Sequence, residues 1–220
     1  MFNNIAFRYD FLNSLLSLGI HKGWRKKAVA VFKDKKPKYI LDVATGTADF
    51  AIEDLKANPE KVTGVDISAG MLEVGREKVS KAGLETKIDL QLVDAEGLPF
   101  VDDHFDAITV GFGVRNFENL EKGLKEMQRV LKPGGDLVIV EFSKPQGFFS
   151  YIYKFYFRYI TPAIGRIFSK DHRAYSYLPE SVEAFPYGEA FCKILESCGY
   201  KNPRSVKLTF GVASIYSATK

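Results

Sequence analysis

The fold of this chain is decided by residues 40–50, which read ILDVATGTADF. The stretch begins as an apolar run typical of a buried parallel strand and turns at Gly46. It then continues into residues that suit the start of a helix. Asp42 and Asp49 bracket the turn. This order is typical of the first strand and helix of a Rossmann-like sheet, in which the turn contacts a nucleotide-type cofactor.

A second strand is expected at 62–66, and it ends in Asp66. In Rossmann-like sheets an acid at the end of the second strand binds the ribose hydroxyls of the cofactor. The sequence therefore predicts a compound that contains adenosine.

The charges around the turn favour one such compound. A dinucleotide site has glycine at the three fixed positions of G-x-G-x-x-G, with the pyrophosphate at the helix N-terminus. Here those positions hold Ala44, Gly46 and Asp49. A carboxylate at Asp49 would repel pyrophosphate, whereas Asp42 and Asp49 together would attract an ammonium and a sulfonium. The pattern predicts S-adenosylmethionine and not NAD.

A third strand is expected at 88–93, followed by Asp94 and Ala95. An acid there can accept the adenine amino group, and a backbone N–H can meet a ring nitrogen. We expect the adenine between the second and third strands.

The remaining elements extend the alternation of strands and helices. Further strands are expected at 105–110, 136–142, 206–210 and 212–219, and helices at 48–56, 70–82 and 120–131. Helical spacing of apolar residues also predicts helices at 7–18 and 22–32. The order predicts an α/β, Rossmann-like, doubly wound and mostly parallel sheet. With 220 residues, of which 46% are hydrophobic, the chain is expected to form a single domain, 1–220, with N-terminal helices within 5–34.

Several motifs together resemble the ubiquinone/menaquinone C-methyltransferase family. They are FNNIA at 2–6 with Tyr9-Asp10, GIHKGWR at 19–25, GFGVRN at 111–116, EFSKP at 141–145 and YLPES at 177–181. The resemblance runs nearly end to end, whereas the cofactor motifs alone specify only class I methyltransferases. Phe7 and the Lys22-Gly23 pair depart from the family pattern, at positions away from the cofactor. Members usually carry some residues ahead of the first motif, so we expect this chain to be short at its N-terminus.

The resemblance implies a fold, a reaction and a set of site residues. The fold would be the class I methyltransferase fold, a seven-stranded sheet with an antiparallel last strand between its neighbours, and an insertion at about 145–185 would cover the substrate. The reaction would be C-methylation of a polyprenylated hydroquinone, most readily demethylmenaquinol, with S-adenosylmethionine as the cofactor. Cofactor-binding residues would be Asp42, Gly46, Thr47, Asp66, Asp94, Ala95 and Gly111.

The catalytic candidates are Arg115, Asn116 and Tyr177. Arg115 would stabilise the phenolate of the acceptor or position a water, because a guanidinium is a poor base. Asn116, Tyr177 and Tyr9 would orient ring oxygens. For Arg115 a salt bridge that anchors its loop remains an alternative. For the whole chain, two alternatives remain: a methyltransferase of the same fold acting on another lipid-like acceptor, and a non-catalytic quinone-binding scaffold subunit.

Charge and composition bear on partners. The net charge is +4, and basic residues crowd 22–38. These residues form a surface that is simply solvated, one that binds anionic lipid, or one that binds nucleic acid. No RNA-binding motif accompanies them, so no nucleic acid partner is predicted. The two cysteines, Cys192 and Cys198, are expected to be free thiols in a reducing cytoplasm, and no metal site is predicted.

Aromatic residues crowd 148–159 within the expected cover. Charges at Lys154, Arg158 and Arg166 and a break at Pro162 exclude a transmembrane helix there. The rings either bind the isoprenoid tail of the substrate, with peripheral membrane contact, or pack against the sheet.

Overall fold

The computed structural model describes residues 19–145, 147, 151 and 180–220. The expected helix at 7–18, Tyr9, Tyr177 and most of the expected cover lie outside these residues. The boundaries of the N-terminal helices and of the cover therefore stay predictions.

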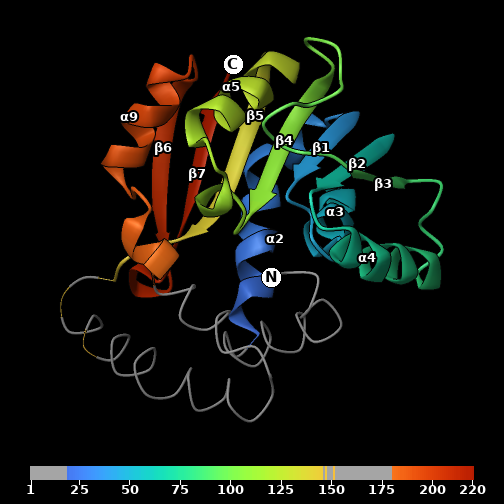
Figure 1. Cartoon of the computed structure of the whole chain (residues 1–220), viewed down its shortest axis with the longest axis horizontal. Coiled ribbons are helices and arrows are strands. Elements are labelled where there is room, and N and C mark those ends of the chain that lie inside the picture. The colour runs from blue at the N-terminus through green and yellow to red at the C-terminus, as the bar shows by residue number, and fades with distance from the viewer. Residues whose placement is uncertain (1–18, 146, 148–150, 152–179) are drawn as a thin grey trace.

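The described residues form a seven-stranded sheet in the order β3-β2-β1-β4-β5-β7-β6 (Figure 1). Strands β1 to β5 pair in parallel, and β7 pairs antiparallel with both β5 and β6. This confirms the predicted fold class, with the last strand between its neighbours. The strands are β1 Tyr39–Val43, β2 Lys61–Asp66, β3 Ile88–Leu92, β4 Phe105–Gly111, β5 Leu131–Phe142, β6 Lys201–Leu208 and β7 Ala213–Thr219.

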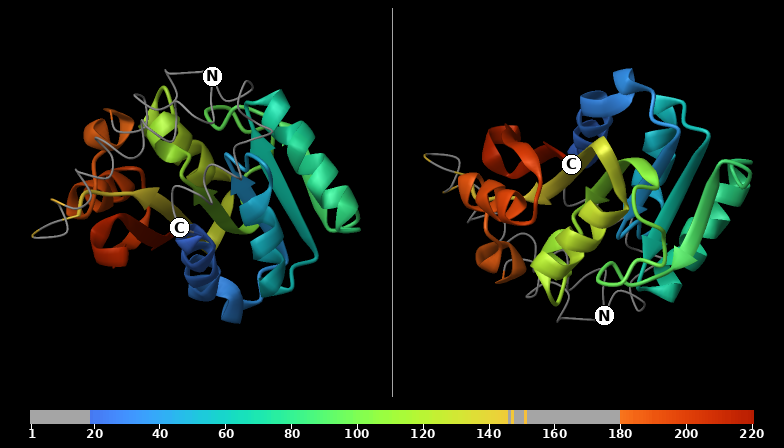
Figure 2. Two further views of the ribbon diagram at one scale, coloured as in Figure 1. Left: turned by 90° about the horizontal axis from the view of Figure 1, so that it is seen from below. Right: turned by 90° about the horizontal axis from the view of Figure 1, so that it is seen from above.

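Helices cover both faces of the sheet, as Figure 2 shows from two sides. They are α2 Ile20–Phe32, α3 Asp49–Asp54, α4 Ala69–Lys81, α5 Leu120–Val130 and α9 Glu189–Ser197. One apolar core lies between the sheet and α2, α3 and α4, and a second between the sheet and α5 and α9. Helix α4 begins where the Ser68 hydroxyl accepts from the Met71 N–H, and α5 begins where Asn119 accepts from the Lys122 N–H.

Helix α2 runs from the carboxyl edge of the parallel strands to the amino edge. Its buried residues follow helical spacing along one stripe, among them Trp24 and Phe32. The Trp24 ring lies 5.9 Å from that of Phe112, which follows β4, whereas Phe32 precedes the turn into β1. The two ends of α2 therefore lie at opposite edges of the sheet.

The strand expected at 206–210 was placed too late. Strand β6 spans Lys201–Leu208, and Phe210 lies in the following turn with φ 56°. Because β6 is an edge strand with nearly every residue exposed, it lacks the apolar alternation from which strands are predicted.

Candidate functional site

The predicted cofactor residues gather at the carboxyl edge of β1, β2, β3 and β4. Asp42 lies in β1, Gly46 and Thr47 in the loop that follows it, Asp66 at the end of β2, Asp94 and Ala95 after β3, and Gly111 at the end of β4. Parallel strands bring these ends together, which is where ligands bind in open α/β sheets.

The loop between β1 and α3 is tightly wound. Ala44, Gly46 and Ala48 all have positive φ, at 55°, 55° and 65°. Glycine adopts this conformation freely, whereas alanine does so at a cost that the surroundings must offset. The Thr45 N–H donates to Val65 O at 3.0 Å, and the Ala48 N–H to Thr45 O at 2.9 Å. The loop is thus fixed against β2.

The Asp66 carboxylate joins this loop to the end of β2. Its Oδ2 accepts from the Gly46 N–H and its Oδ1 from the Ser68 N–H, each at 2.8 Å. Burial raises the pKa of Asp66, and the backbone N–H groups of Ser68, Gly46 and Ile67 oppose that shift. Each carboxylate oxygen has a further lone pair, so Asp66 can accept two hydroxyl groups side by side.

Two apolar side chains that sequence reasoning missed lie exposed between the ends of β2 and β3. Ile67, directly after Asp66, is 72% exposed, and Leu92, the last residue of β3, is 58% exposed. Asp94 is also exposed, and its Oδ1 accepts from the Glu96 N–H at 2.9 Å. Apolar side chains beside a polar acceptor suit the faces and edge of a planar base. The signal was available in the sequence, since Ile67 directly follows Asp66 and Leu92 lies two residues before Asp94, both at the predicted binding edge.

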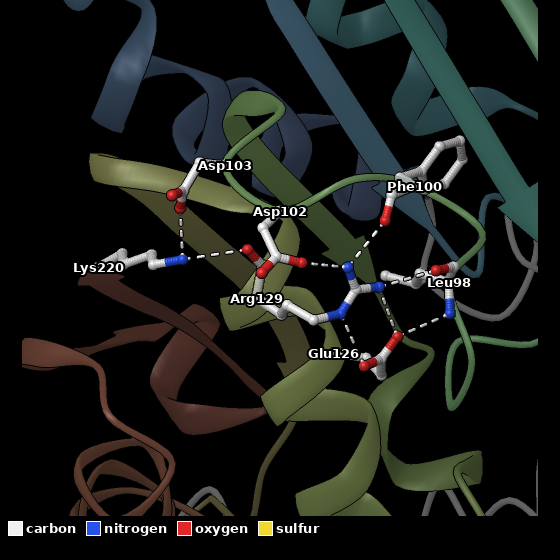
Figure 3. A network of polar contacts seen from close by, with 7 residues as sticks. All are labelled: Leu98, Phe100, Asp102, Asp103, Glu126, Arg129 and Lys220. Atoms are coloured by element: carbon white, nitrogen blue, oxygen red, sulfur yellow. Dashed lines mark hydrogen bonds and ion pairs between the residues drawn. The ribbon is translucent and has the colours of Figure 1, made fainter.

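Arg129 of α5 holds the segment that follows Asp94 and Ala95 (Figure 3). Its guanidinium donates to Leu98 O and Phe100 O, each at 2.8 Å, and to Asp102 Oδ1 at 2.7 Å. It also pairs with Glu126, whose Oε2 accepts from the Leu98 N–H at 3.0 Å. The five donors of the guanidinium are all engaged, which fixes this segment against α5.

Replacing Arg129 with lysine is expected to weaken cofactor binding about tenfold, the equivalent of about one lost hydrogen bond, with little change in kcat. A single ammonium cannot make the contacts to both carbonyls and both acids at once. Cofactor titration and steady-state kinetics measure the two effects. Arg204→Lys on the exposed strand β6 is the matched control, and equal affinities of both variants for the cofactor would contradict the prediction.

Asp42 and Asp49, predicted to attract the cofactor's cations together, each have other partners in this structure. Asp42 is fully buried and accepts from the Thr45 hydroxyl at 2.6 Å. Asp49 is paired with Arg25 at 2.9 Å and with Lys78 at 2.7 Å. Because its charge is offset by two cations from α2 and α4, Asp49 is not the free carboxylate that the prediction needed.

Thr47 and Gly111 have packing roles in this structure. Thr47 is buried and accepts from Lys78 Nζ at 3.2 Å. A Cβ at Gly111 would lie 2.8 Å from Cδ1 of Phe50, closer than side chains pack. Glycine at this position is therefore required by the first turn of α3, whatever the ligand.

Arg115 forms the buried ion pair that was the alternative to its catalytic role. Its Nη1 donates to Glu141 Oε1 at 2.8 Å and also contacts Phe112 O, and the two side chains are 6% and 0% exposed. The guanidinium carbon lies 5.3 Å from the centre of the Phe142 ring. Asn116 Nδ2 donates to the same Phe112 carbonyl at 3.4 Å. Arg115 and Asn116 thus both hold the loop after β4.

Comparison with known proteins identifies the family. The model of the ubiE/COQ5 methyltransferase family matches residues 1–220. The chain belongs to this family. It is therefore a methyltransferase, which confirms both the resemblance and the enzyme class predicted from the sequence.

Relatives and solved structures agree with this assignment. The chain is 50% identical to the demethylmenaquinone methyltransferase of Bacteroides fragilis, with all of this chain and 91% of the relative covered. It is 47% identical to the ubiquinone/menaquinone biosynthesis C-methyltransferase of Geotalea daltonii, with 100% and 94% covered. A SAM-dependent methyltransferase from Aquifex aeolicus shares the fold, with a TM-score of 0.61, 22% identity, and 82% of this chain and 81% of that chain covered.

Within the described residues, no group of three or more His, Cys, Asp or Glu side chains could hold a metal ion. In the same part of the chain, no helix is both long enough and apolar enough to span a membrane.

Proposed function

We propose that this methyltransferase transfers the methyl group of S-adenosylmethionine to a ring carbon of a polyprenylated hydroquinone, demethylmenaquinol. The observation that carries the proposal is Asp66, which keeps two acceptor positions beside exposed Ile67 and Leu92. This geometry occurs in a chain 50% identical to a demethylmenaquinone methyltransferase.

The residues at the strand ends fit the proposed cofactor. Asp66 would accept the two ribose hydroxyls, Asp94 the adenine amino group, and the Ala95 N–H would meet a ring nitrogen. Ile67 and Leu92 would contact the faces of the adenine. When bound, the cofactor supplies a methyl group on a sulfonium, an electrophile that a carbon nucleophile can attack.

The chain contributes alignment and electrostatics to the reaction. Ring carbon is a weak nucleophile, and ionisation of a neighbouring hydroxyl makes it a stronger one. In our proposal, Arg115 and Asn116 hold the loop after β4 in place beside the acceptor, and the Arg115 charge favours the phenolate. Tyr177, outside the described residues, remains a candidate for orienting a ring oxygen.

A product assay tests the acceptor class. Purified enzyme is incubated with the cofactor and, in turn, demethylmenaquinol, a sterol and a phenolic acid, and the products are measured by mass spectrometry. Methylation of the quinol alone supports the proposal. Preferred methylation of the sterol or the phenolic acid would instead favour a methyltransferase of the same fold that acts on another acceptor. Cofactor binding without any product favours a non-catalytic subunit.

Any membrane contact would involve only part of the basic region 22–38. Lys35 pairs with Asp136 at 2.8 Å, and Lys38 with Glu60 at 3.1 Å, both at the amino edge of the parallel strands. Lys22, in the first turn of α2, lies instead at the site edge. The region is therefore not one surface facing a bilayer beside the site, and we restrict the proposed peripheral contact to the site edge.

The aromatic residues at 148–159, all but Tyr151 outside the described residues, carry a separate prediction. Replacing Phe148, Phe149 and Tyr153 with serine is expected to raise the KM for a long-tailed quinol by about tenfold or more, because apolar area for the tail is lost. A tail-less naphthoquinol should be little affected. Steady-state kinetics with both acceptors measure the two KM values. An equal rise in KM for both acceptors would contradict binding of the tail by these rings.

A further inference from the structure

A buried group of three side chains lies beneath the loop between β1 and α3, residues 44–48, which we call the cofactor loop. Asp42 in β1 and Thr109 in β4 are register partners on neighbouring parallel strands, and Asp54 ends helix α3 above them. All three are 0% exposed. Two carboxyl groups therefore lie together in the core, at the foot of the loop that carries Gly46.

Thr109 connects the two acids. Its Oγ1 lies 2.7 Å from Asp54 Oδ2 and 3.4 Å from Asp42 Oδ1. Thr45 in the loop donates to the other Asp42 oxygen at 2.6 Å. Asp54 Oδ1 is buried and has no hydrogen-bond partner among the described residues.

The available hydrogen-bond donors and acceptors distinguish between two charge states of Asp42 and Asp54. If both acids were ionised, they would share the single Thr109 proton, and Asp54 Oδ1 would be a buried anionic oxygen without a donor. Such a group is costly, and two buried like charges add to the cost. If Asp54 is protonated on Oδ2, it donates to Thr109, which in turn donates to Asp42. The unpaired oxygen is then a neutral carbonyl, which costs far less.

The surrounding charges also favour a proton on Asp54. Burial raises the pKa of Asp54 well above its usual range, and the negative charges of Asp42 and Glu53 raise it further. Burial also raises the pKa of Asp42, but Thr45, the Ala51 N–H and Thr109 oppose that shift.

The nearby cations are already engaged elsewhere. Arg25 from α2 and Lys78 from α4 pair with Asp49, and Lys56 pairs with Glu53. None of these three cations is paired with Asp54, which also has fewer hydrogen-bond donors than Asp42.

We propose that Asp54 holds a proton in the folded enzyme at neutral pH and, through Thr109, keeps Asp42 as the anion that anchors Thr45 in the cofactor loop. Asp54 is thus a positioning residue. The proton itself is independent of the proposed function, whereas its effect on cofactor binding rests on that function.

Carbon-13 NMR of protein labelled at the aspartate carboxyl carbon tests the proton directly. At pH 7 the wild-type enzyme should show one carboxyl resonance at the position of a protonated acid, and Asp54→Asn should remove it. Absence of such a resonance from the wild type would overturn the proposal, even if the variant fails to fold. A resonance that persists in Asp54→Asn would place the proton on another aspartate and also overturn it.

Stability against pH provides a second readout. A carboxyl whose pKa is raised on folding takes up a proton, so its contribution to stability is lost as pH rises from the unfolded pKa towards the folded one. Asp54→Asn removes this pH-dependent loss of stability, because asparagine does not take up a proton. Between about pH 5 and pH 6.5 the folding equilibrium constant of the variant should rise relative to wild type by up to about tenfold per pH unit. A ratio that does not change with pH would contradict the proposal.

Binding of S-adenosylhomocysteine separates positioning from simple packing. Asp54→Leu, which cannot donate to Thr109, should lose about tenfold more affinity than Asp54→Asn, which can. Equal losses in both variants would overturn the positioning role. If the wild type binds no S-adenosylhomocysteine, the proposed function fails, while the NMR and stability results still decide where the proton lies.

Discussion

Replacing Glu141 with alanine is expected to lower the free energy of unfolding by about 3–5 kcal/mol, because it leaves the Arg115 guanidinium charged and unpaired in the protein interior. Both side chains of the pair are almost inaccessible to solvent, and Glu141 also accepts from the Phe142 N–H at 2.8 Å. For a domain of this size the melting temperature should fall by roughly 6–20 °C. Thermal unfolding followed by circular dichroism measures the change.

The matched control is Glu77→Ala, which removes one partner of the exposed pair with Lys81 on α4. Exposed pairs contribute little, so this variant should stay within about 0.5 kcal/mol of wild type. If both variants melt at the same temperature, the buried pair does not stabilise the loop after β4, and the prediction is wrong.

Replacing Asp66 with alanine is expected to weaken cofactor binding by about 1.5–3 kcal/mol for each charged hydrogen bond lost, or roughly 10- to 150-fold per bond. The side chain would accept two ribose hydroxyls in addition to the N–H groups of Gly46 and Ser68. Calorimetric titration with S-adenosylhomocysteine measures the affinity. Asp66→Asn, which keeps the volume and one acceptor oxygen, should fall between wild type and alanine.

The control for Asp66 is again Glu77→Ala, whose carboxylate lies on the exposed side of α4. Unchanged affinity of Asp66→Ala for the cofactor would mean that the ribose does not lie at the end of β2. A loss of affinity that accompanies unfolding would instead indicate that Asp66 acts through its backbone contacts, and circular dichroism distinguishes the two.

The fold was predictable because its signals are local. Buried parallel strands read as short apolar runs, and the acids at 66 and 94 end or follow such runs at the edge where ligands bind, whereas Asp42 lies within its run. The exposed edge strand β6 was misplaced for the opposite reason, since its sequence has no apolar alternation.

Side-chain partners were harder to predict because they come from distant parts of the sequence. The pairing of Asp49 with Arg25 and Lys78 depends on how α2, α3 and α4 pack, and no local pattern reports that. The ion pair between Arg115 and Glu141 could have been predicted from the sequence. Both residues lie in recognised motifs, and β4 and β5 are adjacent parallel strands, so the end of β5, with Glu141, lies close to the loop that follows β4.

The most direct test of the central claim is the identity of the bond formed. Enzyme, S-adenosylmethionine carrying a carbon-13 methyl group and demethylmenaquinol are incubated under reducing conditions, and the extracted product is examined by carbon-13 NMR. We expect a labelled methyl group on a ring carbon. A labelled methoxy group, or no transfer to the quinol by enzyme that binds the cofactor, would contradict it.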